Sequence, residues 1–175
     1  MMNMTEYIRQ YQTPIGTLTA ISEGTAITDL SFDTPKKLSY INKNIIPNSD
    51  LPVFAELENW LKTYFAGEDP GRQPLIKAAG TPFQQSVWQI VAGVPYSTLI
   101  TYGEIARRLA RERGIPKMSA QAVGNAMGHN PISLLIPCHR VINSDGSLGG
   151  YGSCPDRKIR LLEYEGIIRS WNTPK

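Results

Sequence analysis

The chain has 175 residues, 41% of them hydrophobic, and a formal net charge of +3. This composition is typical of a globular protein with one core or two small ones, and no apolar run reaches the roughly 18 residues that a membrane-spanning helix needs. The first residues lack the apolar centre of a signal peptide, and two cysteines suit free thiols in a reducing compartment. We therefore expect a cytoplasmic protein without a membrane anchor.

Charge is distributed unevenly along the chain. Residues 1–80 carry 7 Lys and Arg against 9 Asp and Glu, whereas residues 81–175 carry 11 against 6. A basic half is often no more than a solvated surface. It is also the half that is suited to contact the phosphates of a nucleic acid, and composition alone leaves both interpretations open.

The first third of the chain predicts a small antiparallel sheet followed by a helix. Three short segments alternate in polarity and are separated by turn residues, namely EYIRQYQ, TLTAIS and AITDLSF. After the break PNSDLP, one helical face is formed by Phe54, Leu57, Leu61, Tyr64 and Phe65, and Gly67 ends the helix. The polar stretch GEDPGRQP is typical of a linker, so we place an α/β domain at residues 1–78 and a second domain at residues 79–175.

The second domain is predicted to be mainly helical. Thr81 and Pro82 begin one helix, and Thr101 with Glu104 has the pattern of a capping box at the start of the next. Ser119 can cap a third helix, AQAVGNAMG, after the loop RERGIPKM. Two helices joined by such a loop favour a helix-turn-helix, although the spacing by itself is a weak indication.

The third of these helices is rich in small residues, namely Ala120, Ala122, Gly124, Ala126 and Gly128. Glycine lowers the stability of a helix, so its presence needs a reason. One explanation is close packing against another helix. The other is a helix backbone that must lie close to a bulky partner, such as the groove of a nucleic acid.

The stretch LLIPCHRVIN places Cys138 directly beside His139, one of only 2 histidines. A free cysteine is usually buried as a small hydrophobe. The alternative is a nucleophile, because cationic neighbours such as His139 and Arg140 lower the pKa of a thiol and only the thiolate attacks. Successive side chains of a strand point to opposite faces. Cooperation of Cys138 with His139 therefore requires that Pro137 break the strand, or that a water bridge the two side chains.

The last helix, PDRKIRLLEYEG, is expected to begin at Pro155 and to end at Gly166. Glu163 and Glu165 lie in its final turn, where the helix dipole disfavours negative charge. Solvent explains Glu163, whereas Glu165 is better explained by a cationic or imidazole partner, for which His139 is a candidate. Cys138, His139 and Glu165 would then have the arrangement of a nucleophile, a base and a group that orients the base.

These stretches resemble the O6-alkylguanine-DNA alkyltransferases, also called methylated-DNA–protein-cysteine methyltransferases. IPCHRV matches the active-site motif of that family residue for residue. Further matches cover most of the chain, namely TPIGTLTAIS, TPFQQSVWQIVAGVPYSTLITYGEIA, AVGNAMGHNPISLLIPCHRVI, GSLGGYG and LLEYEG. The resemblance implies a small α/β N-terminal domain with an antiparallel sheet, followed by a mainly α, winged-helix-like DNA-binding domain.

The resemblance also implies roles for the reactive residues. Cys138 would accept the alkyl group, and His139 would deprotonate it, commonly through a water. Glu165 would hold His139 in the required tautomer, and Asn130 would brace the turn that precedes the active site. Tyr102 would lie at the phosphate that rotates during base flipping and would donate a proton to the leaving guanine.

Other implied residues concern the DNA and the flipped base. The second helix of the helix-turn-helix would enter the minor groove of double-stranded DNA. Gln121 occupies the position at which many members of the family carry an intercalating arginine. Contacts with the base or the DNA are implied for Gln121, Asn130, Met127, Val141, Tyr151, Gly152, Ser153, Ala120 and Gly124.

The implied activity is DNA repair in which the alkyl group of O6-alkylguanine, and of O4-alkylthymine, moves to Cys138. The product is a thioether with no route of release, so each molecule acts once, as a monomer, with no cofactor and no metal. The alternatives are a lesion-sensing protein without chemistry, a cysteine hydrolase and a winged-helix transcription regulator. The presence of Cys138 argues against the first, and the set of Cys138, His139 and Glu165 argues against the last.

Overall fold

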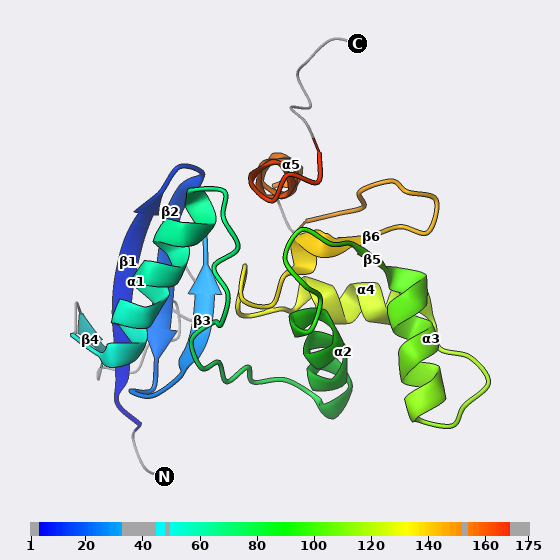
Figure 1. Ribbon diagram of the computed structural model, residues 1–175. Helices are drawn as coiled ribbons and strands as arrows, with labels where there is room; N and C mark the ends of the chain where they lie inside the picture. The colour runs from blue at the N-terminus through cyan, green and yellow to red at the C-terminus, as the bar shows by residue number, and fades with distance from the viewer. Residues whose placement is uncertain (1–3, 33–44, 48–49, 152–153, 169–175) are drawn as a thin grey trace. The chain divides into compact units, whose positions relative to one another are not determined.

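The computed structural model describes residues 4–32, 45–47, 50–151 and 154–168 (Figure 1). The chain forms two compact units, one of residues 1–79 with 131–135 and the other of residues 80–130 with 136–175. The first unit contains β1 (Glu6–Thr13), β2 (Gly16–Ser22), β3 (Ile27–Ser31), β4 (Ile45–Pro47) and α1 (Pro52–Phe65). The second contains α2 (Pro82–Ala92), β5 (Ile100–Thr101), α3 (Tyr102–Glu112), α4 (Ala120–Gly128), a 3₁₀ turn (Cys138–Arg140), β6 (Val141–Ile142) and α5 (Pro155–Tyr164).

The sheet of the first unit has the strand order β3-β2-β1-β4. The pairs β1–β2 and β2–β3 are antiparallel, which confirms the predicted sheet. β4 was not predicted, and it pairs parallel to β1, so the sheet is mixed. Parallel strands cannot be joined by a short hairpin. The turn residues that predict the hairpins between β1, β2 and β3 therefore do not predict the pairing of β4 with β1.

Helix α1 lies across one face of this sheet (Figure 1). Its predicted apolar face is buried at Phe54, Leu57, Leu61 and Tyr64, and Phe65 is half-buried. The hydroxyl of Tyr11 in β1 donates to the carbonyl of Phe54 at 2.9 Å. The helix ends where Gly67 adopts a φ of 79°, a conformation that favours glycine.

Residues 131–135 belong to the first unit although they lie far along the chain. Leu30 in β3 donates its N–H to the carbonyl of Pro131 at 2.9 Å, and Ser133 donates to the carbonyl of Leu30 at 2.8 Å. The segment therefore runs beside β3 as a short parallel bridge. The two units are not simple consecutive halves of the chain.

Helices α2, α3 and α4 pack together in the second unit. Thr81 and Gln84 form a reciprocal capping box at the start of α2, and Ser119 caps α4 as predicted. At α3, Thr101 accepts the N–H of Glu104, but the Glu104 carboxylate pairs with Arg108 at 2.6 Å, so the predicted capping box is replaced by a cap and an ion pair.

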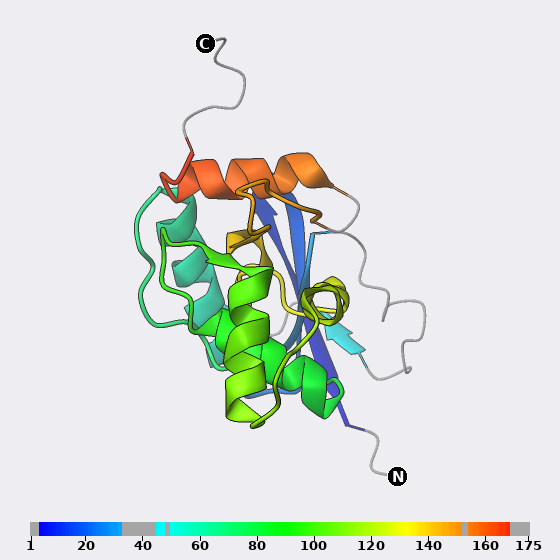
Figure 2. The ribbon, with the colours of Figure 1, turned by 90° about the vertical axis from the view of Figure 1, so that its right-hand side faces the viewer.

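The two helices that the sequence predicts as a helix-turn-helix are α3 and α4. The first is upright in both views, whereas the second is seen from the side in Figure 1 and end-on in Figure 2, so the two helices cross. The indole of Trp88 in α2 donates to the carbonyl of Ala126 in α4 at 2.9 Å, which anchors α4 to the core. Within the described ranges, no helix is long and apolar enough to span a membrane.

A short parallel ladder positions the candidate site. Ile100 pairs with Val141 and Thr101 with Ile142. Because α3 follows β5 without a gap, Tyr102 begins α3 next to this ladder, and the 3₁₀ turn with Cys138 leads into β6 on the other side.

Candidate active site

The motif around Cys138 folds as a turn and not as a strand. Pro137 precedes a 3₁₀ turn formed by Cys138, His139 and Arg140. Residues in such a turn are three per revolution, so neighbouring side chains do not point to opposite faces as they would in a strand. The apolar residues before Pro137 form turns, so the expected strand is absent and Pro137 does not break one.

The thiol of Cys138 is held by Asn130. The Asn130 side-chain nitrogen lies 2.6 Å from Sγ and also donates to the carbonyl of Ile136 at 2.9 Å. On another side, Sγ lies 4.0 Å from the carbonyl oxygen of Met127 at the end of α4. Asn130 and Met127 therefore both lie at the predicted nucleophile.

Burial raises the pKa of Cys138 to about 12, although the hydrogen bond from Asn130 and the charge of Lys158 both act to lower it. The resting thiol is thus protonated at neutral pH, and its sequence neighbours His139 and Arg140 do not produce a thiolate by themselves. Nucleophilic attack from this position requires a base that takes the proton as the reaction proceeds.

His139 and Glu165 form a fully buried pair, with Nε2 and Oε1 2.5 Å apart. Burial lowers the pKa of His139, more than its contacts with Glu165 raise it, so the imidazole is neutral at pH 7. Burial alone would raise the pKa of Glu165, but the hydrogen bonds from His139 and Arg140 and the charge of Arg140 outweigh it and lower that pKa to about 2. The structure therefore joins the two residues that the sequence paired on the basis of the helix dipole.

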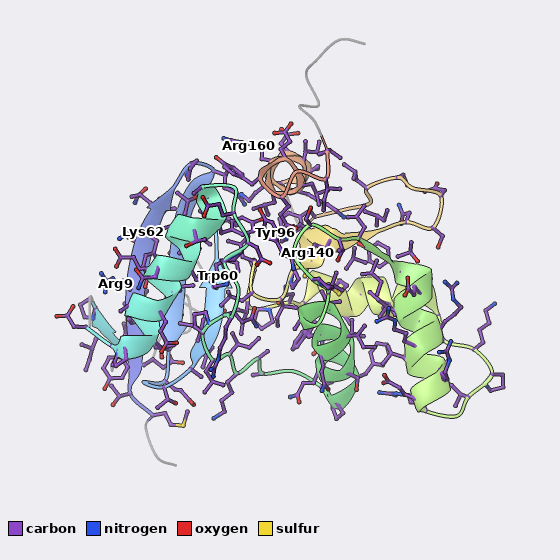
Figure 3. All side chains as sticks on the ribbon, in the orientation of Figure 1. Arg9, Trp60, Lys62, Tyr96, Arg140 and Arg160 are labelled. Carbon is purple, nitrogen blue, oxygen red and sulfur yellow. The ribbon has the colours of Figure 1, made fainter. Side chains whose placement is uncertain are left out.

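Arg140 is directed at Glu165, not at the thiol, which corrects the expectation that it supplies a positive field beside Cys138. Its Nε donates to Oε2 at 2.9 Å and its Nη2 to Oε1 at 3.0 Å, while Nη1 donates to the carbonyl of Val94 at 2.7 Å. The guanidinium also lies over the ring of Tyr96, 5.8 Å from its centroid (Figure 3).

This ion pair has a consequence for the imidazole. Because Arg140 balances the charge of the Glu165 carboxylate, His139 can remain neutral and donate its Nε2 proton to Glu165. Nδ1 is then the basic nitrogen of the ring. A neutral, oriented imidazole of this kind is suited to act as a general base.

Two residues of this site, Ser97 and Lys158, were not predicted from the sequence. Ser97, in the connection between α2 and β5, donates its N–H to Oε2 of Glu165 at 3.1 Å. No local pattern indicates this contact. Lys158 did carry a signal, because it precedes Leu161 and Leu162 by three and four positions and therefore lies on the buried face of α5.

Lys158 is 1% exposed and close to the thiol. Its ammonium donates to the carbonyl of Val141 at 2.6 Å and also to the carbonyl of Leu148. Burial lowers the pKa of Lys158 to about 8, so the side chain is mostly charged at neutral pH. It joins the predicted pocket residue Val141 to the loop that leads to Tyr151.

Tyr102 lies on the other side of this loop. A Cβ placed at Gly149 would be 3.5 Å from its Cε2 atom, and Gly149 has a φ of 71°, so the loop approaches the ring closely. Burial raises the pKa of Tyr102, and the neighbouring Cys138 raises it further, so the phenol is protonated. Tyr151 is half-buried, whereas the predicted loop residues Gly152 and Ser153 lie outside the described residues.

The predicted contact residues of α4 lie on its accessible side. Ala120 and Gln121 are exposed and Gly124 is half-buried, whereas Met127 and Val141 are buried, Met127 with its carbonyl near the thiol. A Cβ at Gly124 would meet no atom of the described structure within 4 Å, and the same holds for Gly128. Close packing of helices within the described structure therefore does not explain these glycines.

Among the described residues, no group of three or more His, Cys, Asp or Glu side chains is arranged to hold a metal ion. Both cysteines are free and half-buried.

Comparison with known proteins identifies the family. Residues 82–167 match the model described as "6-O-methylguanine DNA methyltransferase, DNA binding domain", and residues 7–70 match "6-O-methylguanine DNA methyltransferase, ribonuclease-like domain". A methylated-DNA–protein-cysteine methyltransferase of Haemophilus influenzae is 36% identical over 92% of this chain and 87% of its own. The corresponding protein of Methanosarcina acetivorans is 37% identical over 91% of this chain and 98% of its own.

A solved structure agrees with this match. The crystal structure of Mycobacterium tuberculosis OGT in complex with DNA superposes with a TM-score of 0.77 at 38% identity, covering 91% of this chain and 92% of that one. Both family models, the curated relatives and the fold thus agree, and the chain belongs to the 6-O-methylguanine DNA methyltransferase family, whose curated members are methylated-DNA–protein-cysteine methyltransferases.

Proposed function

We propose that this protein repairs DNA by transferring the alkyl group of O6-alkylguanine, and of O4-alkylthymine, irreversibly to its own Cys138. One observation carries the proposal most directly. The buried imidazole of His139, the residue after Cys138, is hydrogen-bonded to the ionised carboxylate of Glu165, while Asn130 contacts the sulfur of Cys138 and Arg140 contacts the carboxylate.

The step that this set supports is a displacement at carbon. Nδ1 of His139, directly or through a water, takes the proton of the thiol as the sulfur attacks the alkyl carbon. The carbon–sulfur bond forms while the bond between carbon and O6 breaks, and the electron pair leaves with the guanine. Tyr102 supplies a proton to the leaving base and recovers one from solvent. The thioether that results has no good leaving group, so one molecule removes one lesion.

A neutral base is required because the thiol is not ionised at rest. With the pKa of Cys138 raised to about 12, the thiolate is scarce at pH 7. The neutral imidazole next to ionised Glu165 can accept the proton, since Glu165 raises the pKa of His139 against the effect of burial. The thiol of Cys138 therefore stays protonated and unreactive until a substrate is in place.

The target atom is inside the double helix, so the nucleotide must leave the stack before it can react. We propose that α4 enters the minor groove, that Gln121 fills the space left by the flipped base, and that Ala120 and Gly124 let the helix backbone approach the DNA. Support comes from α4 itself, where Gln121 is exposed and Gly124 faces no atom of the described structure within 4 Å.

The base pocket is proposed to lie between the thiol and the loop before α5. Met127 and Val141 would form its floor, and Tyr151, Gly152 and Ser153 would cover the base.

We propose further that the division between residues 78 and 79 separates a supporting domain from the domain that carries Cys138. The protein would act as a monomer in the cytoplasm, where free thiols stay reduced.

Intact-protein mass spectrometry tests the proposal. After incubation with duplex DNA that contains O6-methylguanine, the mass should rise once by about 14 Da, the methylene difference expected for a stable thioether, on the peptide that holds Cys138. Cys138→Ala should still bind the lesion and gain no mass. Label on Cys154, or continued product formation beyond one equivalent as a cysteine hydrolase would give, would refute the assignment. A lesion-sensing protein without chemistry would bind and gain no mass even with Cys138 present.

A further inference from the structure

Ser97 has a backbone conformation that needs a reason. Its φ is 60°, and among the described residues it is one of two that are not glycine and have a positive φ. A residue with a Cβ is disfavoured in this left-handed region, and such strain persists only where the surrounding structure imposes it. Ser97 is exposed, so side-chain packing does not impose it.

The hydrogen bonds of Ser97 supply the reason. Its N–H donates to Oε2 of Glu165 at 3.1 Å, and its hydroxyl donates to the backbone carbonyl of Glu165 at 2.6 Å. One exposed residue thus holds both the carboxylate and the main chain of Glu165, across 68 positions of sequence. Ser97 makes both bonds from its left-handed conformation.

Neighbouring residues of the same connection hold the surroundings of Glu165. Val94 accepts a hydrogen bond from Nη1 of Arg140 at 2.7 Å, and the hydroxyl of Tyr96 donates to the carbonyl of Tyr164 at 3.2 Å. Ser97 differs from them in touching the carboxylate itself.

The two carboxylate oxygens have different partners. Oε1 accepts from Nε2 of His139 and from Nη2 and Nε of Arg140, whereas Oε2 accepts from Nε of Arg140 and from the N–H of Ser97. Arg140 bonds both oxygens and so restrains the carboxylate from one side. The N–H of Ser97 is a further donor to Oε2, from a different element of the chain, and adds to that restraint.

We infer that Ser97 is a positioning residue for alkyl transfer, whose strained backbone aims the Glu165 carboxylate at His139. The inference rests on the proposed function, because Glu165 acts through the base of that reaction. It assigns the effect to the backbone conformation of Ser97, and only secondarily to its hydroxyl.

Three substitutions separate conformation from side-chain chemistry. Ser97→Gly adopts a positive φ freely, Ser97→Ala does so with difficulty, and Ser97→Val, which is β-branched, is the least able to do so. All three lack the hydroxyl, so differences among them report the backbone alone. Leu99→Val is the matched control, since it places the same β-branched residue at an exposed position of the same connection where φ is not positive.

The readout is the rate at which free O6-benzylguanine labels Cys138, measured by intact mass across pH. This substrate needs no base flipping, so DNA binding does not enter. We expect Ser97→Val to lower the plateau rate by about tenfold, Ser97→Ala to lower it less, and Ser97→Gly to retain the most. The midpoint of the acidic limb should move to lower pH in the same order, because Glu165 raises the pKa of His139 and that contribution weakens.

Leu99→Val should match the wild type in rate and midpoint. If Ser97→Val does not fold, as judged by its thermal transition, the rates and pH midpoints of Ser97→Ala and Ser97→Gly still test the inference. Equal rates and midpoints for Ala and Gly would overturn the inference, and so would a loss in Leu99→Val equal to that in Ser97→Val. Failure of the wild type to acquire a methyl group from duplex DNA that contains O6-methylguanine would instead refute the proposed function.

Discussion

Nε2 of His139 and Oε1 of Glu165 lie 2.5 Å apart, with both side chains fully buried. A hydrogen bond to an ionised group in such an environment is strong and poorly replaced by water. Arg140 completes the pair from the other side and keeps Glu165 ionised. Water therefore cannot readily replace the Glu165 carboxylate as the hydrogen-bond partner of His139.

Glu165→Gln and His139→Ala should each slow methyl transfer about 100-fold or more, the range expected for a general base. The double variant should be little slower than either single variant, because both changes disable one relay. Single-turnover rates on duplex DNA with O6-methylguanine measure this, with lesion binding as the control for folding. Independent effects that multiply in the double variant would show that the two residues do not act together.

The pH dependence of transfer should follow the imidazole and not the thiol. Burial lowers the pKa of His139, so the acidic limb for free O6-benzylguanine should lie below the ordinary histidine value of about 6.5. The rate should then stay level through neutral pH. A rate that keeps rising through pH 8 and 9 would mean that the thiol ionises directly, without the neutral base.

Acid stability should reveal the charge of Glu165. Its pKa is depressed to about 2 in the folded state, against about 4.3 in an unfolded chain. The stabilisation from the ionised carboxylate is therefore complete above about pH 4.3 and lost as the pH falls toward 2.

Glu165→Gln should accordingly unfold at lower temperature than the wild type at pH 7, because it leaves Arg140 as a buried charge without its carboxylate partner. The difference between the two melting temperatures should shrink as the pH is lowered below 4.3, a value typical of an unperturbed glutamate. A difference that stays constant from pH 7 to pH 3 would contradict an ionised Glu165.

Lys158→Met should slow the reaction of Cys138 with free O6-benzylguanine by about tenfold, equivalent to one further unit of thiol pKa. The charge of Lys158 lowers the pKa of Cys138, and the variant also removes the donor that Val141 and Leu148 share. Because the pKa of Lys158 is about 8, the difference in rate between the variant and the wild type should be largest below pH 8 and should narrow above it.

Arg160→Met, which removes an exposed charge from the same helix, should change the rate by less than about twofold. Equal losses in both variants would assign the effect to helix charge in general.

Substitutions of Gln121 test the proposal that its side chain fills the space left by the flipped base. Its amide has one acceptor oxygen and a two-proton donor, so it can pair with the orphaned cytosine in ways that arginine cannot. Gln121→Ala should clearly slow repair of duplex DNA and barely change the reaction with free O6-benzylguanine. Gln121→Arg should tighten DNA binding and steepen its dependence on salt, because it adds a charge that displaces counterions. If the Ala variant loses as much with the free base as with the duplex, Gln121 is an ordinary structural residue.

The sequence by itself determined the features that depend on local signals. Thr81 and Ser119 cap α2 and α4 as predicted, because a cap bonds to a backbone group only a few residues away. Alternating polarity located the three antiparallel strands, and the proline before Cys138 indicated that Cys138 does not lie in a regular strand. The family, too, could be read from contiguous motifs such as IPCHRV.

Only the tertiary structure decided which distant groups meet. Arg140 is two positions from Cys138 in sequence yet pairs with Glu165, while the cation near the thiol is Lys158 from α5. Ser97 reaches Glu165 across 68 positions, and its strain has no sequence signal. Such contacts arise because folding closes long loops and buries charges that must then find partners. Periodicity and composition report which face of an element is buried, but not which neighbour covers it.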